Sequence, residues 1–211
     1  MTYTVKEIFY TLQGEGANTG RAAVFCRFAG CNLWSGVERD RTNAVCQFCD
    51  TDFVWNSTMD AGKFNSPVDL ARAVADVWPQ QVGGKPLVVC TGGEPLLQLD
   101  SDLISAFHAK GFEVAVETNG TLVPPEGIDW LCVSPKVDAE LVITNGDELK
   151  LVFPQEGVSP QSYENLAFSN FYLQPMDGPR REEYTQLAIE YCKANPRWRL
   201  SIQVHKIIGI R

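Results

Sequence analysis

Three cysteines near the N-terminus are spaced in a way that could hold a metal centre. Fourteen residues separate Cys31 from Cys46, and two residues separate Cys46 from Cys49. A structural zinc site usually closes with four ligands, often from two C-x2-C pairs, and this segment contains one such pair. Three thiolates instead suit a 4Fe-4S cluster in which one iron stays open to bind a ligand and pass it an electron. A zinc ion completed by Asp50, Asp52 or a distant histidine is the alternative.

A second polar motif, GGEP at residues 92–95, directly follows the apolar run PLVVCT. An ordinary turn between a strand and a helix would also use glycine and proline. Glu94, however, places a charge at the end of a strand, where ligands bind in parallel sheets. Gly92 and Gly93 would let the backbone approach a ligand closely, and the carboxylate could hold a cation such as the ammonium of an amino acid.

Further polar clusters follow the later strands that the sequence predicts. They are Glu117-Thr118-Asn119-Gly120, Ser134-Pro135-Lys136, Gln174-Pro175-Met176 and His205. One such cluster would be an ordinary turn. Together with GGEP they number five, and this repetition predicts that one rim of the sheet is lined with hydrogen-bonding groups.

Apolar periodicity indicates the elements that must position these motifs. Strands are predicted near Val5–Phe9, Ala22–Phe28, Pro86–Thr91, Phe112–Thr118, Trp130–Ser134, Glu148–Phe153, Phe171–Leu173 and Leu200–Val204. Helices are predicted after the Ser66-Pro67 cap, with Leu70, Val74 and Val77 on one face, and near Asp100–Lys110 and Arg180–Ala194.

Alternating strands and helices imply a parallel sheet that is buried on both faces. Three long helices are too few for a complete eight-unit barrel, which typically takes about 250 residues. The expected fold is therefore α/β, an open and partial TIM-like barrel reduced in helices. No linker composition divides the 211 residues, so a single domain over 1–211 is expected.

Composition excludes several kinds of partner. The formal net charge of −8 gives no basic footprint for DNA or RNA, so a small molecule is the expected ligand. Neither a signal peptide nor an apolar run of about 18 residues is present, which predicts a cytoplasmic protein that does not enter membranes. Cys90, Cys132 and Cys192 lie in apolar patterns and are expected to pack as small hydrophobic residues.

The cysteines, GGEP and the partial barrel together resemble the radical S-adenosylmethionine (SAM) enzymes. The usual cysteine motif there is C-x3-C-x2-C, and this chain departs from it. Deleting residues 35–45 leaves CNLWCQFCDT, which restores the usual spacing. The departure therefore indicates an eleven-residue insertion in the cluster-binding loop, with Ser35 at the position where cysteine is usual.

A narrower resemblance covers nearly the whole chain. IFYTLQGEGANTGRAAVFCRFAGCNLW, with CDT, ETNG, SPK, LQPM and the terminal VHKIIGIR, is similar to the 7-carboxy-7-deazaguanine synthase family. That family implies conversion of 6-carboxy-5,6,7,8-tetrahydropterin to 7-carboxy-7-deazaguanine with loss of ammonia. A 5′-deoxyadenosyl radical would remove the hydrogen at C6 before the ring contracts.

The resemblance also implies a set of site residues. Cluster ligands would be Cys31, Cys46 and Cys49. The SAM pocket would comprise Gly92, Gly93, Glu94, Ser134, Lys136, Thr118, Asn119, Gln174, Met176, Phe48 and Asp50. The pterin would contact Leu12, Gln13, Gly14, Glu15, Arg27, Thr91, Glu117, His205 and Arg211.

The chemistry of two of these residues suits a carboxypterin. The 2-amino group and the neighbouring ring N–H of a pterin are adjacent donors, and the Glu15 carboxylate could accept from both. A substrate carboxylate calls for a bidentate cation, which Arg27 offers. The resemblance further implies Mg²⁺ with Thr51 as its protein ligand, an external flavodoxin-like electron donor, and a homodimer that would cover exposed strand edges.

Two other classes of protein share part of this pattern. A glycyl-radical activase would have the cluster and GGEP but act on a protein, with little use for QGEG and Arg27. A non-enzymatic zinc module would share the cysteines alone.

Overall fold

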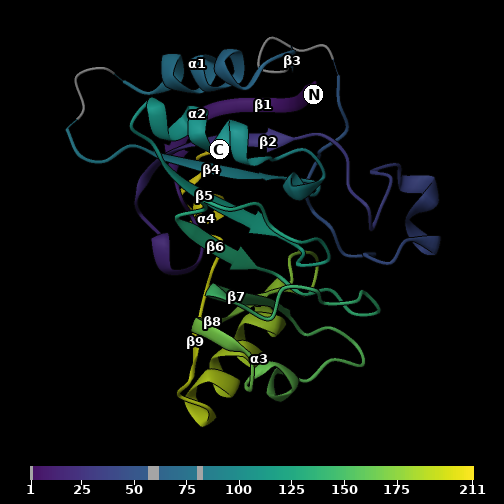
Figure 1. Cartoon of the computed structure of the whole chain (residues 1–211). Coiled ribbons are helices and arrows are strands. Elements are labelled where there is room, and N and C mark those ends of the chain that lie inside the picture. The colour runs from purple at the N-terminus through teal and green to yellow at the C-terminus, as the bar shows by residue number, and fades with distance from the viewer. Residues whose placement is uncertain (1, 57–61, 80–82) are drawn as a thin grey trace.

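The computed structural model describes residues 2–56, 62–79 and 83–211. The strands in these ranges are β1 (Tyr3–Leu12), β2 (Ala22–Phe28), β3 (Gly62–Phe64), β4 (Leu87–Gly92), β5 (Glu113–Thr118), β6 (Trp130–Val133), β7 (Asn145–Phe153), β8 (Ala167–Pro175) and β9 (Trp198–Leu200). They form one open sheet in the order β3-β1-β2-β4-β5-β6-β7-β8-β9 (Figure 1). From β2 to β9 all neighbours are parallel, and β1 is antiparallel to both β2 and β3.

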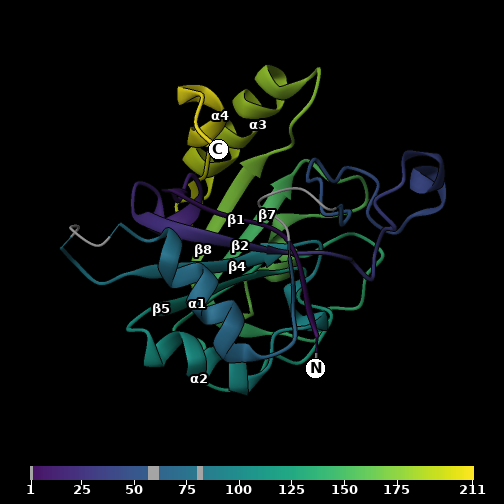
Figure 2. The same ribbon diagram turned by 90° about the horizontal axis from the view of Figure 1, so that it is seen from above.

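The helices of the described ranges are α1 (Pro67–Val77), α2 (Ser101–Ala109), α3 (Arg181–Ala194) and the short α4 (Val204–Ile208). Ser66 caps α1 by accepting from the Asp69 N–H, and Asp100 caps α2 by accepting from the Leu103 N–H. Helices α1 and α2 cover the first half of the sheet, and α3 packs on β8 and β9. Figure 2 shows α1 and α2 on one side of the molecule and α3 and α4 on the other.

Two apolar cores hold these layers together. The first joins α1 and α2 to β1, β2, β4 and β5, and the second joins α3 to β7, β8 and β9. Strand β2 shows how alternation separates core from site: Cys26 is fully buried in the first core, whereas its neighbour Arg27 faces the opposite side. Cys90 and Cys132 are buried as well, as the sequence predicts.

The open, mostly parallel α/β sheet confirms the expected fold class, while one predicted strand is wrong and the short strand β3 was missed. The strand predicted at Leu200–Val204 is wrong, because β9 ends at Leu200 and Val204 begins α4. The Val204 N–H donates to the Gly14 carbonyl at 3.0 Å, so this segment turns back onto the loop after β1 and leaves the sheet. Strand β3 was not predicted, because its sequence, Gly-Lys-Phe, contains one large apolar residue and shows no apolar pattern.

No helix in the described part of the chain is long and apolar enough to cross a membrane.

Candidate active site

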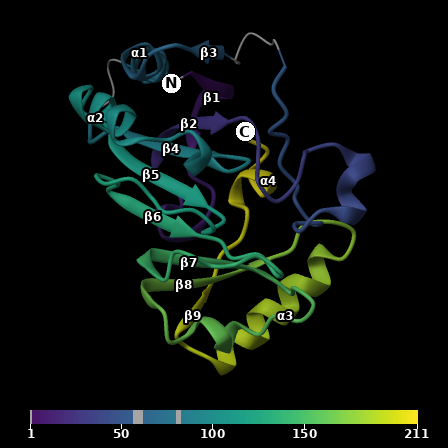
Figure 3. The same ribbon diagram turned by 45° about the vertical axis from the view of Figure 1, so that its right-hand side comes forward.

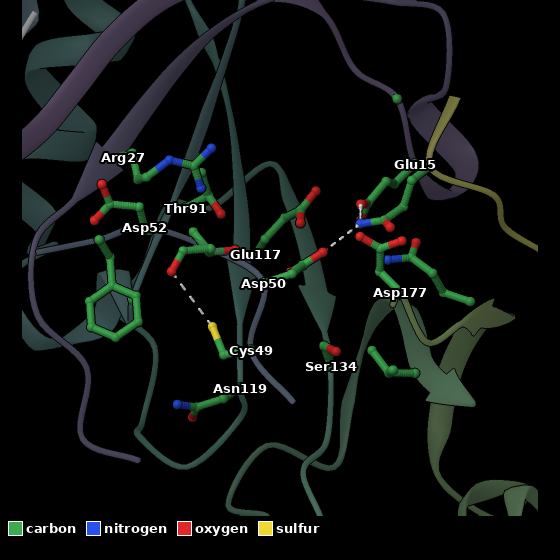
Figure 4. A pocket seen from close by; sticks show the side chains of 18 of the residues that line it. Glu15, Arg27, Cys49, Asp50, Asp52, Thr91, Glu117, Asn119, Ser134 and Asp177 are labelled. Carbon is green, nitrogen blue, oxygen red and sulfur yellow. Dashed lines mark hydrogen bonds between the residues drawn. The ribbon is translucent and has the colours of Figure 1, made fainter. Parts of the chain in front are cut away.

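A cavity of about 410 Å³ opens where the parallel strands end. Every site residue predicted from the sequence lines this cavity, with the exception of Glu94. Figure 4 shows side chains from several strands and loops pointing into the same space, among them Arg27 of β2, Thr91 of β4 and Glu117 of β5. Parallel strands bring their carboxyl ends to one edge, which is why motifs far apart in sequence meet here.

The three cysteines form one wall of the cavity. Cys31 and Cys49 are half-buried and Cys46 is buried, and the Leu33 N–H donates to the Cys31 Sγ at 3.4 Å. Burial raises the pKa of the Cys31 and Cys46 thiols, and the Lys136 ammonium partly offsets this at Cys46. Among the described residues, no three His, Cys, Asp or Glu side chains converge closely enough to hold a single metal ion. A closed zinc site needs that convergence, whereas an iron-sulfur cluster binds each cysteine through a different iron.

The long gap between Cys31 and Cys46 is a closed loop. The N–H groups of Val45 and Cys46 both donate to the Leu33 carbonyl, at 3.1 and 3.3 Å. The chain therefore leaves after Trp34 and returns to the same place. Ser35 does not line the cavity, and its hydroxyl donates to the Asp40 carboxylate at 2.8 Å. This geometry is what an insertion between the first two cysteines would produce.

The two glycines of GGEP lie directly against the cysteine loop. A Cβ added to Gly92 would lie 2.1 Å from the Phe28 carbonyl oxygen, and one added to Gly93 would lie 2.0 Å from the Gly30 oxygen. Gly92 also has a φ of +134°, which favours glycine. The Glu94 N–H donates to the Gly30 carbonyl at 2.9 Å. The end of β4 is thus fastened to the residue that precedes Cys31.

Glu94 departs from the expected placement. Its side chain is fully buried and accepts from the Leu96 N–H at 2.9 Å, the Thr118 hydroxyl at 2.8 Å and the Asn119 N–H at 2.8 Å. Burial raises the pKa of this carboxyl, although those hydrogen bonds favour the ionised form. The carboxylate therefore lies behind the cavity wall and links the ends of β4 and β5 through hydrogen bonds. Two of its hydrogen-bond partners, Thr118 and Asn119, line the cavity.

An ion cluster forms another part of the cavity wall. The ammonium of Lys150, a residue 4 % exposed, donates to Glu15 at 2.6 Å and to Glu117 at 3.1 Å. Gln13 donates to the other oxygen of Glu117 at 2.7 Å, and Gln203 donates to the other oxygen of Glu15 at 3.0 Å. These contacts join four segments: the loop that follows β1, strand β5, strand β7 and the residues just before α4.

Within this ion cluster, Lys150 and Glu15 each stabilise the ionised form of the other. Burial alone would raise the pKa of Glu15, but the adjacent Lys150 ammonium outweighs it and lowers that pKa to about 2. Burial would lower the pKa of Lys150, and the Glu117 and Glu15 carboxylates instead raise it well above its usual value. Glu15 and Lys150 are therefore both ionised at neutral pH. Sequence analysis missed Lys150, although a lysine in the apolar strand sequence ELKLVF was a usable signal.

Arg27 lies in a second charged group. Its Nε donates to one oxygen of Glu7 at 2.7 Å, and the Arg211 guanidinium donates to the other oxygen at 2.7 Å. Arg27 pairs with Thr91 in the register of β2 and β4, so both side chains emerge at the same height of the cavity. Glu7 was not predicted as a site residue, and it holds the arginine in place.

Two other predicted site residues, Asp50 and His205, make contacts that the sequence could not show. The Asp50 carboxylate accepts from Lys206, which also donates to Asp177 at 2.7 Å. His205 reaches the cavity from α4, and a Cβ on Gly14 would lie 2.3 Å from its Nδ1, so the glycine makes room for the ring. Lys6, Asp177 and Lys206 also line the cavity and were not predicted, and Asp52, considered only as a possible zinc ligand, lines it as well.

Comparisons with known proteins agree with this site. The Radical SAM superfamily matches residues 40–199, a range that includes Cys46 and Cys49 and begins inside the insertion, after Cys31. The chain is 61% identical to a 7-carboxy-7-deazaguanine synthase of Caulobacter vibrioides and 59% identical to one of Burkholderia multivorans, each over 100% of both chains. A crystal structure of QueE from Escherichia coli superposes with a TM-score of 0.70 at 27% identity, covering 97% of this chain and 95% of the other.

The fold and the site therefore define a radical SAM protein. Within that superfamily, the chain belongs to the 7-carboxy-7-deazaguanine synthase family, on full-length identity of about 60%.

Proposed function

We propose that this protein converts 6-carboxy-5,6,7,8-tetrahydropterin to 7-carboxy-7-deazaguanine with release of ammonia, a step of queuosine biosynthesis. One observation supports this most directly: three cysteines share a single cavity with the Glu15-Lys150-Glu117 ion cluster and with Arg27. A cavity of about 410 Å³ suits small molecules better than a polypeptide, which favours the pterin over the protein substrate of an activase.

The donor set fits a 4Fe-4S cluster held by Cys31, Cys46 and Cys49, with SAM beside it. When bound, these groups supply a 5′-deoxyadenosyl radical that abstracts hydrogen from the substrate. The protein's part is positioning. Gly92 and Gly93 let the end of β4 lie against the cysteine loop, beside the part of the cavity where the amino group of SAM would bind, and Glu94 holds the ends of β4 and β5 together.

The rest of the SAM pocket is polar. Lys136 donates to the Ser134 hydroxyl at 2.8 Å, and burial lowers the pKa of this lysine, an effect that the Cys46 and Cys49 side chains counteract in their thiolate form. Both side chains would meet the carboxylate and ribose of SAM. The other residues proposed for this pocket are Phe48, Asp50, Thr118, Asn119, Gln174 and Met176, all of which line the cavity.

The pterin would be recognised by the charged residues on either side of it. A carboxylate has about four acceptor sites, and the two hydrogen bonds to Glu15 leave capacity for the 2-amino group and the ring N–H. Arg27 would bind the substrate carboxylate, with its orientation maintained by Glu7. Leu12, Gln13, Gly14, Thr91, Glu117, His205 and Arg211 would complete the pterin site.

A Mg²⁺ ion would bind the Thr51 hydroxyl, substrate oxygens and water. One protein hydroxyl is enough for a hard cation that keeps much of its hydration shell. An external flavodoxin-like electron donor and a homodimer complete the proposal.

The test is anaerobic reconstitution with iron and sulfide, followed by incubation with the carboxypterin, SAM, Mg²⁺ and a reductant. Mass spectrometry should detect 7-carboxy-7-deazaguanine, in an amount that exceeds the SAM consumed. A pterin without the 6-carboxylate is the matched control and should give no product. Cleavage of SAM without any deazaguanine would support the superfamily and reject this substrate, and a colourless protein with one zinc would reject the enzyme altogether.

A further inference from the structure

Arg41 links the 35–45 insertion to the segment that carries the second and third cysteines. Its Nη1 donates to the Gln47 carbonyl at 3.0 Å and to the Cys49 carbonyl at 3.1 Å. One side chain of the insertion therefore contacts the backbone on both sides of Phe48. Figure 3 shows the insertion, in blue, standing away from the sheet on the side where the parallel strands end.

The guanidinium is held in place by two other contacts. It lies 4.0 Å from the centre of the Trp34 ring, and its Nε donates to both oxygens of Glu38 at 2.9 Å. Trp34 is itself 8 % exposed and packs edge-on against Phe53. Trp34 is the last residue before the insertion, so Arg41 connects the two ends of the loop to each other.

The neighbouring Arg39 has none of these features. Its side chain is 84 % exposed, against 26 % for Arg41, and its ion pair is with Asp40 beside it in the sequence. Two arginines of one short 3-10 turn thus have opposite surroundings, which provides a matched control.

A long loop between two ligands has a physical cost. Each added residue increases the conformational entropy that is lost when both cysteines must bind one cluster. The three-residue spacer of the usual motif restricts the loop by its shortness, and a fourteen-residue spacer needs internal contacts instead. A planar guanidinium can stack on an indole while its N–H groups donate within its plane, and an ammonium, which is not planar, cannot stack in this way.

We propose that Arg41 is the positioning residue of the cluster loop: it holds the Cys46 to Cys49 segment in the ligand geometry and places a fixed positive charge beside it. The inference rests on the proposed assignment of the three cysteines to a 4Fe-4S cluster. A fixed cation favours the more negative, reduced form of a cluster and so raises its reduction potential.

The experiment compares Arg41→Gln, Arg41→Lys and Arg39→Gln with the wild type after identical reconstitution. The rate at which a chelator removes iron should rise about tenfold in both Arg41 variants and stay unchanged in Arg39→Gln. The reduction potential, followed by electron paramagnetic resonance, should fall in Arg41→Gln and remain near the wild-type value in Arg41→Lys, which keeps the charge.

Two outcomes would overturn the proposal. In the first, the iron-release rate and the reduction potential of Arg41→Gln equal those of the wild type. In the second, both quantities change as much in Arg39→Gln as in Arg41→Gln. Circular dichroism of the metal-free variants checks folding, and Arg41→Lys retains a test if Arg41→Gln does not fold. A wild-type protein that binds no cluster would contradict the proposed function itself, so the two failures are distinguishable.

Discussion

Lys150 and Glu15 form an ion pair of 2.6 Å that joins β7 to the loop after β1, 135 residues earlier in the chain. Both side chains are largely buried, at 4 % and 14 % exposure. A buried charge needs a partner, so the two residues depend on each other for their ionised state. This pair lies within the proposed pterin site, where its charge state bears on substrate recognition.

Replacing Lys150 by Met should therefore impair stability and binding together. Loss of one partner leaves Glu15 and Glu117 uncompensated, which should reduce the free energy of unfolding by about 3–5 kcal/mol in urea denaturation. Lys150→Arg keeps the charge and should lose less. A Lys150→Met protein as stable as the wild type would show that the pair contributes nothing.

The same variant should change the pH dependence of pterin binding. The Glu15 pKa is lowered to about 2, so the carboxylate of the wild type is ionised at all neutral and mildly acidic pH values, and the stability that it contributes is lost only as pH falls toward that value. Without Lys150, burial raises the pKa, and proton uptake competes with the substrate. Calorimetric affinity should then weaken in Lys150→Met as the pH is lowered from neutral and stay flat in the wild type over the same range. The other ionisable neighbours, Glu117, Glu148 and His205, are common to both proteins.

Arg27→Met should lower the affinity for the carboxypterin and leave SAM binding unchanged. Loss of a charged hydrogen-bond pair to the substrate carboxylate corresponds to about 10- to 100-fold in affinity. Arg21→Met is the control, because Arg21 pairs with Glu113 and does not line the cavity. The Arg27→Met protein should bind pterins with and without the 6-carboxylate equally well. A retained preference for the carboxylated pterin would assign recognition of the carboxylate to another residue.

Cys46→Ala should prevent cluster assembly, whereas Ser35→Ala should leave it intact. Iron and sulfide content and the visible absorbance after reconstitution measure both. Ser35 bonds to Asp40 inside the insertion and lies outside the cavity, so its hydroxyl is not needed as a ligand. Loss of the cluster in Ser35→Ala would reverse the assignment of the insertion.

Gly93→Ala should destabilise the protein and reduce its iron content. The added methyl would lie 2.0 Å from the Gly30 oxygen and 2.9 Å from the Cys31 Cβ, so the cysteine loop must move. Overpacking of this kind costs about 1–3 kcal/mol in the free energy of unfolding. Gly83→Ala meets no atom within 4 Å and should behave like the wild type. Normal iron content in Gly93→Ala would show that the contact does not position the loop.

Thr51→Val should raise the Mg²⁺ concentration for half-maximal activity by about tenfold, the effect of losing one modest ligand. Thr185→Val on α3, where the hydroxyl bonds to the Arg181 carbonyl, serves as the control. An unchanged Mg²⁺ requirement in Thr51→Val would remove Thr51 from the proposed Mg²⁺ site.

The sequence alone determined the features that depend on neighbouring residues. The capped start of α1, the burial of Cys90 and Cys132 and the position of GGEP at the end of β4 are all local, and each was predicted correctly. The insertion at residues 35–45 stays a prediction, made because deleting these residues restores a known spacing. Local patterns of this kind are set by side-chain periodicity and by the backbone preferences of glycine and proline.

Only the tertiary structure decided which charges meet. Lys150 looks like one more residue of an apolar strand until β7 lies opposite the loop after β1, and Glu94 looks like a ligand residue until Thr118 and Asn119 close around it. Arg41 gains its contacts when the insertion folds back onto Gln47 and Cys49. Burial and charge pairing depend on residues distant in the chain, so the ionisation and orientation of these groups follow from packing and cannot be deduced from residue types.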